Sequence, residues 1–128
     1  MEELKTTKFI ATLWVCEWYG HENDTWGKTA KEIVGKVWQE KAEKVFQDSG
    51  IYVSAWVTDS NIVYSKNRWC PDGWEKVVKI SGTRNPEFCK DVEKYKQAVI
   101  DVLTLSKEEL KQSTTQVEFF DEDMVYIK

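Results

Sequence analysis

The chain contains 128 residues, of which 41% are hydrophobic and 31% charged, and its formal net charge is −4. This length favours one domain spanning residues 1–128, because two domains would each be too small to bury a proper core. The composition is that of a folded globular protein, and no run of apolar residues is long enough for a membrane helix. Lysines and carboxylates are interspersed, which argues against nucleic acid as a partner.

The three cysteines, Cys16, Cys70 and Cys89, are an odd number and form no Cys-x-x-Cys pair. They are typical of reduced thiols rather than of a disulfide framework. The first residues also lack the basic and then apolar pattern of a secretory signal, so we expect a cytoplasmic protein. The Cys and His spacing fits no structural zinc site, and we expect neither a metal nor a cofactor.

The first half of the chain predicts a strand followed by a helix. Residues 9–19 are β-branched, aromatic and apolar, without Gly or Pro, which is strand composition, and residues 20–24 supply a polar turn. From residue 25 to residue 48, apolar side chains recur every three or four positions. This spacing predicts an amphipathic helix, which Gly50 closes.

The middle of the chain predicts three strands. Residues 51–58 and 61–66 have strand composition, and the polar pair at 59–60 suggests a tight hairpin between them. A Pro-Asp-Gly turn then precedes a further predicted strand over 74–81. We therefore expect these segments to form an antiparallel meander.

The last part of the chain predicts a second helix and a final strand or hairpin. Asn85 has the chemistry of an N-cap, and Pro86 suits the first helical position. The capping-box spacing that begins at Ser106 predicts a short additional turn, before a strand or hairpin over 116–127.

This order of elements favours an α+β fold. We expect a two-layer sandwich with a mainly antiparallel sheet and two helices on one face. The order strand, helix, three strands, helix, strand comes closest to a ferredoxin-like topology.

Aromatic residues gather on one face of the predicted strands. Because side chains alternate across a strand, the aliphatic residues of 9–19 and 51–58 share the face that suits the helices. The opposite face carries Trp14, Cys16, Trp18, Tyr52 and Trp56. An exposed aromatic patch of this size normally marks an interface or a ligand groove. The alternative is a second small core, in which the final segment 116–127 or the loop 69–74 covers this face.

These features favour a non-enzymatic interaction protein of the inhibitor, immunity or adaptor type, which binds a protein partner or a second copy of itself. A homodimer is the simplest form, because two such sheets stacked face to face bury both patches. The residues predicted to bind are Trp14, Trp18, Tyr52, Trp56, Trp69 and Trp74.

A small-ligand protein or enzyme is the second interpretation. The loop at 81–86 leads from a predicted strand into a predicted helix N-terminus, where free N–H groups and the helix dipole favour an anion. Thr83, Arg84 and Asn85 are the anion-binding candidates. A nucleotide-like or other anionic ligand then lies in a pocket between the aromatic face and the Arg84 loop. The competing interpretation of this loop is an ordinary capped turn.

Two further clusters carry little predicted chemistry. Cys16 and Glu17 point to opposite faces of the predicted strand, and His21 follows a turn, so the three form no ready nucleophile and base. We predict no catalytic residue among them. The acidic residues at 118 and 121–123 lack the spacing of an EF-hand loop and are typical of a solvated hairpin tip.

Overall fold

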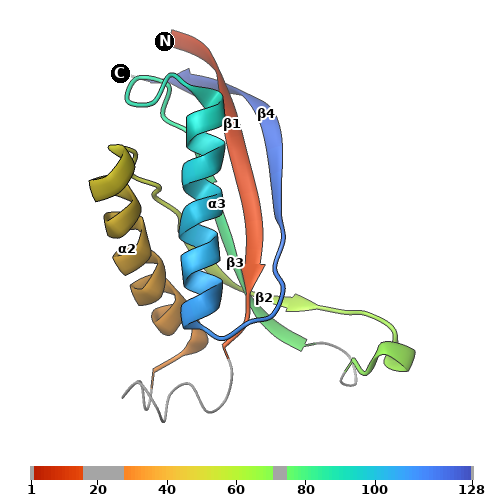
Figure 1. Cartoon of the computed structure of the whole chain (residues 1–128). Helices are drawn as coiled ribbons and strands as arrows, with labels where there is room; N and C mark the ends of the chain where they lie inside the picture. The colour runs from red at the N-terminus through yellow and green to blue at the C-terminus, as the bar shows by residue number, and fades with distance from the viewer. Residues whose placement is uncertain (1, 16–27, 71–74, 128) are drawn as a thin grey trace.

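A computed structural model describes residues 2–15, 28–70 and 75–127 of the chain (Figure 1). The elements are β1 (Glu2–Leu13), α2 (Ala30–Ser49), β2 (Trp56–Ile62), the short 3₁₀ helix η1 (Lys66–Arg68), β3 (Glu75–Thr83), α3 (Val92–Glu109) and β4 (Val117–Tyr126). Over these residues the strands form one antiparallel sheet in the order β2-β3-β1-β4. Both helices lie on the same face of this sheet. The predicted α+β sandwich is confirmed, and its strand order is that of a ferredoxin-like fold.

Helix α2 begins and ends where the sequence provides caps. Thr29 Oγ1 accepts the N–H of the third helical residue at 3.2 Å, and Gly50, at a φ of 77°, donates its N–H to the carbonyl of Phe46 at 2.7 Å. The apolar stripe of the helix is buried, and Trp38 Nε1 donates to the carbonyl of Val53 at 3.0 Å. The amphipathic spacing therefore identified this helix, which begins at Ala30, later than the predicted residue 25, and ends at Ser49.

Helix α3 begins later than predicted. Asn85 Oδ1 accepts the N–H of Glu87 at 3.0 Å, which closes a single turn and starts no α-helix. Asp91 is the N-cap instead, and its Oδ1 accepts an N–H of the first helical turn at 3.1 Å. The helix continues unbroken to Glu109, so Ser106 is a buried helical residue and not the cap of a separate turn. Asn85 misled the prediction because Asx turns and N-caps use the same side-chain hydrogen bond.

The predicted hairpin over residues 51–66 is wrong. A single strand, β2, runs straight through residues 59 and 60 and pairs with β3 from Trp56 opposite Ser81 to Ile62 opposite Glu75. The sheet therefore has four described strands where five were predicted. Polar residues are tolerated in β2 because it is an edge strand, and this polarity resembles that of a turn.

The core lies between the sheet and the two helices. Phe9 and Ile80 are fully buried there, and the Phe9 ring stacks on Trp38 with centroids 5.8 Å apart. Gly82 lets the β3 backbone pass close to its neighbours, since a Cβ there would lie 2.6 Å from the Phe9 ring and from the Ser54 carbonyl oxygen. This packing brings β1, β3 and the chain before β2 close together at the end of β3 that leads to α3.

The other face of the sheet is covered by neither helix (Figure 1). The register places Ile10, Ser81 and Trp56 in one row across it, and Trp56 is 76% exposed. The last strand, β4, pairs along β1 and lengthens the sheet instead of folding over this face. The alternative of a second core beneath the final segment is therefore not found among the described residues.

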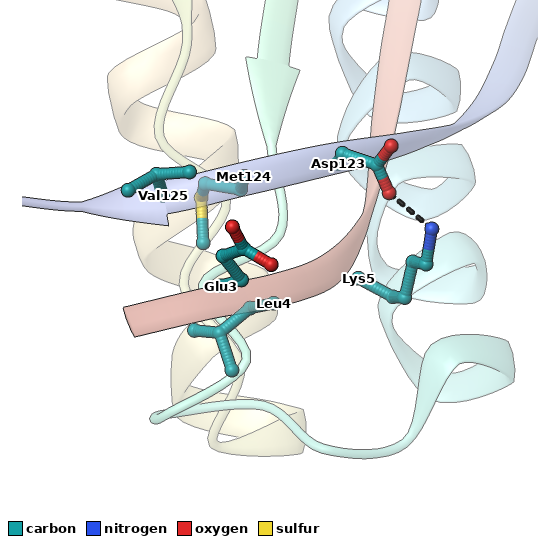
Figure 2. A pocket seen from close by; sticks show the side chains of 6 residues that line it. All are labelled: Glu3, Leu4, Lys5, Asp123, Met124 and Val125. Atoms are coloured by element: carbon teal, nitrogen blue, oxygen red, sulfur yellow. Dashed lines mark hydrogen bonds and ion pairs between the residues drawn. The ribbon is translucent and has the colours of Figure 1, made fainter. Parts of the chain in front are cut away.

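Strands β1 and β4 line a depression of about 400 Å³, in which Lys5 and Asp123 form an ion pair (Figure 2). The hydrogen bond to Asp123 raises the pKa of Lys5 above its usual value. Both side chains are largely exposed, so this pair contributes little to stability. The acidic residues at 118 and 121–123 lie along this edge strand and not at a hairpin tip as predicted, and there they discourage pairing with another sheet.

No helix in the described part of the chain is long and apolar enough to cross a membrane. The single-domain assignment stays a prediction. Several predicted features lie outside the described residues, namely the turns at 20–24 and 71–73 and the residues Cys16, Glu17, Trp18, His21 and Trp74.

Candidate functional site

The β2–β3 connection holds a tyrosine against a carboxylate. Tyr64 Oη donates a hydrogen bond to Glu75 Oε2 at 2.6 Å, which joins the end of β2 to the start of β3. This hydrogen bond, helped by burial and by the charge of Glu75, raises the pKa of Tyr64 from 10.0 to about 12. The phenol therefore stays protonated at neutral pH and keeps donating to the carboxylate.

An unusual backbone lies beside this pair. Ser65 caps η1 by accepting the N–H of Asn67 at 3.1 Å, and Trp69 ends the helix with a φ of 69°. A bulky side chain in the left-handed region costs roughly 1–2 kcal/mol, and such strain clusters at functional sites. The indole of Trp69 is 88% exposed, so burial of this side chain does not offset the strain.

Apolar side chains at this end of the sheet are left open to solvent. Ile62, Val63 and Trp69 are all exposed, and the segment that carries them projects away from the two helices (Figure 1). We call the segment from Ile62 to Glu75, as far as it is described, the hairpin end. Exposed apolar groups around a polar pair are typical of a surface that binds a ligand or another chain.

The opposite end of β3 leads into the loop that was predicted to bind an anion. Arg84 is buried, and its two terminal nitrogens donate to the carbonyls of Cys89 at 2.8 Å and of Lys5 at 3.3 Å. The backbone N–H of Arg84 donates to the carbonyl of Thr7 at 2.8 Å. These bonds connect β1 to the loop before α3. The two terminal nitrogens of the guanidinium are therefore engaged with backbone carbonyls, while its buried Nε has no hydrogen-bond partner among the described residues. The group is buried and does not face an open anion site.

Two cavities adjoin this loop, as the second interpretation of the sequence proposed. One, of about 480 Å³, is lined by Tyr52, Thr83 and Asn85 among others, and a second, of about 340 Å³, is lined by Trp56 and Thr83. The helix N-terminus is not part of this arrangement, because α3 begins at Val92. The structure thus gathers aromatic and polar residues here, and the described residues that line the two cavities include no free cationic group for an anion.

The remaining predicted binding residues are spread out. Trp14 follows the end of β1, is half-buried, and donates its backbone N–H to Gln112 Oε1 at 3.1 Å. Tyr52 precedes β2 and lies edge-on to Phe46, with centroids 6.3 Å apart. Of the described residues in the predicted patch, only Trp56 stands on the open sheet face within a strand. The single aromatic patch is thus dispersed, and the binding role of these residues stays a prediction.

Sequence reasoning missed the Tyr64–Glu75 pair. The two residues are 11 positions apart, and they meet only because β2 and β3 pair in the observed register. The assumed turn at 59–60 placed Tyr64 in a separate strand. The sequence does show Tyr64 and, 11 residues later, Glu75. Such a tyrosine and carboxylate are common on protein surfaces, so they gave no specific signal.

The fold, the cavities and the Tyr–carboxylate pair define a small α+β protein with places suited to a small molecule. The described residues contain no group of three or more acidic, His or Cys side chains that could hold a metal ion. A family model described as SAM lyase matches residues 3–128, and the chain therefore belongs to the SAM lyase family. Comparison with curated proteins and with solved structures finds no match.

This family membership overturns the main interpretation of the sequence. A non-enzymatic protein of the inhibitor, immunity or adaptor type, defined by protein binding, is wrong, because the matched family is named for an enzyme. The aromatic residues suggested an interface because large exposed aromatic groups serve protein partners and ligands equally well. The second interpretation, a small-ligand protein or enzyme, agrees better with the family.

Proposed function

We propose that this protein is an enzyme that cleaves S-adenosylmethionine, abbreviated SAM, in a lyase reaction. The observation that carries the proposal is the SAM lyase family match, which extends over residues 3–128 and so includes every described strand and helix except the first residue of β1. The small α+β fold and its polar pair beside exposed apolar groups are compatible with a small cationic substrate.

The reaction needs neither water nor an oxidant. SAM is a sulfonium ion, and breaking the bond between sulfur and the γ-carbon of its methionine part sends both electrons to sulfur. The leaving group is then the neutral thioether 5′-methylthioadenosine. The four-carbon fragment either bonds its own carboxylate oxygen to the γ-carbon or loses a proton from the β-carbon. In both routes the products together contain all the atoms of the substrate.

Glu75 and Tyr64 are the residues we assign to the substrate. A carboxylate attracts a sulfonium ion, and aromatic rings such as that of Trp69 attract a cation through their faces. The hydrogen bond from Tyr64 fixes the carboxylate in one position before the substrate arrives. Glu75 is the first residue of β3, so its backbone is anchored in the sheet.

The side chains of the hairpin end must be shielded from water before they bind a substrate tightly. Tyr64 is 37% exposed and the apolar side chains of Val63 and Trp69 are open to solvent. A second copy of the chain, packed on these apolar groups, would exclude water and strengthen the attraction between substrate and carboxylate. We therefore propose that the enzyme works as an assembly of its own copies, a homodimer being the simplest form.

We also propose a cytoplasmic location. The described cysteines, Cys70 and Cys89, are both free thiols, which suits a reducing compartment.

The direct test is to incubate the purified chain with SAM and separate the products by liquid chromatography and mass spectrometry. We expect 5′-methylthioadenosine together with a four-carbon product whose mass shows no added water. Unchanged SAM over a range of protein concentrations would contradict the proposed activity. A product that retains the sulfonium group would show a different reaction class.

A further inference from the structure

We call the end of β3 at Thr83, where the chain leads on towards α3, the crossover end. A cavity at this end lies far from the hairpin end. It has a volume of about 480 Å³ and lies where the end of α2, the chain before β2, the end of β3 and the start of α3 meet. Thr83 lines it, whereas Glu75 lies eight residues earlier on the same strand, which is about 27 Å at ~3.4 Å per residue. One molecule of substrate size cannot contact both places, so the cavity is separate from the proposed reaction site.

The walls of the cavity are aromatic and uncharged. Phe46, Tyr52 and Phe88 contribute rings, and none of the described lining residues carries a carboxylate, an ammonium or a guanidinium group. The rings of Phe46 and Tyr52 pack edge to face at an angle of 71°. Ser54 and Thr83 add hydroxyl groups to the lining. This composition suits a flat, uncharged ring system that carries polar substituents.

An unpaired donor belongs to the same cavity. Tyr95 lines it and is 3% exposed, yet its hydroxyl has no hydrogen-bond partner among the described residues. Burial, together with the nearby thiol of Cys89, raises the pKa of Tyr95 well above its usual value, so this hydroxyl remains a donor. A buried tyrosine hydroxyl normally finds a partner, and an acceptor atom on a ligand ring supplies one once a small shift of the side chains uncovers the hydroxyl, which has less than 1 Å² of accessible surface in the free chain.

The backbone around the cavity is pre-formed. The loop beside it is fixed by the bonds of Arg84 to Cys89 and Lys5, and Asn85 Oδ1 accepts from Tyr126 Oη at 2.8 Å. On the other side, the missing side chain of Gly82 lets the Ser54 carbonyl lie close against β3. A rigid cavity loses little conformational entropy when a ligand enters.

We propose that this cavity binds an uncharged purine nucleoside. The purine ring packs against the aromatic walls, a ring nitrogen accepts the hydroxyl of Tyr95, and the sugar contacts the hydroxyls of Ser54 and Thr83. The proposal goes beyond the proposed reaction. Only one ligand depends on that reaction. 5′-Methylthioadenosine, the neutral nucleoside released from SAM, then occupies the cavity to an extent set by its concentration.

The test is a titration of the ¹⁵N-labelled full chain with adenosine, followed by NMR. We expect saturable shifts of the amide signals of Ser54, Thr83 and Phe88, with little change at Glu75. Tyr95→Phe should weaken adenosine binding about tenfold while the melting temperature stays the same or rises, because it removes an unpaired buried hydroxyl. Phe88→Ala, which changes an exposed side chain, should also weaken binding.

Two controls separate this proposal from the proposed reaction. Glu75→Gln should leave adenosine binding at the cavity unchanged. Adenosine 5′-monophosphate should bind more weakly than adenosine, since the lining residues that the structure describes include no cationic side chain. Absence of saturable shifts, shifts confined to residues 62–75, or full-strength binding by Tyr95→Phe would each overturn the proposal. SAM turnover measured on the same samples reports on the reaction independently.

Discussion

The two ends of β3 use their polar residues in opposite ways. At the crossover end, Arg84 is buried and its terminal nitrogens donate to backbone carbonyls of the chain itself. At the hairpin end, Glu75 accepts one hydrogen bond from Tyr64, among apolar side chains that remain exposed. A charged residue whose hydrogen bonds are made within the fold stabilises structure, whereas one with remaining acceptor capacity on an open surface is available to a ligand.

This difference explains why residue type alone pointed to Arg84 as a ligand-binding residue and not to Glu75. Arginine in a loop before a helix suggests an anion site, but here it joins β1 to the crossover. The carboxylate at the start of β3 carries no sequence signature, yet the fold leaves it in reach of a cation beside exposed apolar side chains. We expect substitutions at the hairpin end to change catalysis, and substitutions at the crossover end to change stability.

Loss of the carboxylate is the substitution with the largest expected effect. Glu75→Gln keeps the shape and can still accept a hydrogen bond from Tyr64, but it removes the negative charge that we assign to the sulfonium. We predict a fall in SAM turnover of roughly 100-fold or more, measured as 5′-methylthioadenosine release. Glu43→Gln, on the exposed surface of α2, is the matched control and should retain full activity. Equal activity of the two variants would remove Glu75 from the site.

At the crossover end, Gly82→Ala should lower stability. A Cβ would meet the Phe9 ring and the Ser54 carbonyl at 2.6 Å, and the backbone carbonyl cannot move aside easily. We predict a loss of ~1–3 kcal/mol in the free energy of unfolding, read from urea denaturation. Gly35→Ala is the control, because nothing lies within 4 Å of its added Cβ and alanine favours a helix by ~0.5–1 kcal/mol. A Gly82→Ala protein as stable as the parent would contradict the close packing at this end.

Removal of the phenol hydroxyl should have a smaller effect on catalysis. Tyr64→Phe loses the hydrogen bond that positions Glu75, and we predict a roughly tenfold drop in turnover with an unchanged fold. Because the pKa of Tyr64 is raised to about 12, its stabilising hydrogen bond is fully present below pH 10 and is lost as the pH rises through 12. Turnover of the parent enzyme should therefore show no step from this tyrosine between pH 7 and pH 10.

The ion pair between β1 and β4 should matter least. Lys5→Ala removes the partner of Asp123, but both side chains are exposed to water and salt screens their attraction (Figure 2). We predict no measurable change in melting temperature or in SAM turnover, at low and at physiological ionic strength. A clear loss of stability in low salt would show that the pair does more than its exposure suggests.

The sequence predicted those parts of the fold that depend on local spacing. The apolar periodicity identified α2, and alternation correctly buried Phe9 and Leu13 beneath the helices. Contacts between distant residues could not be predicted in this way. Arg84 bonds to a carbonyl 79 positions away, and Tyr64 reaches Glu75 only through the register of β2 with β3. A polar edge strand and a hairpin turn also have similar composition, so residues 59–60 were predicted as a turn although they lie within β2.

The most direct test of the account is the specific activity of the enzyme across a dilution series, with the molar mass read by light scattering on the same samples. We predict that SAM turnover per chain falls as assemblies dissociate, because the hairpin end then loses its cover. Val63→Lys should shift both curves to higher protein concentration, since it places a charge on the exposed apolar surface. A monomer that cleaves SAM at the full rate would contradict the claim that the reaction takes place at a shared hairpin end.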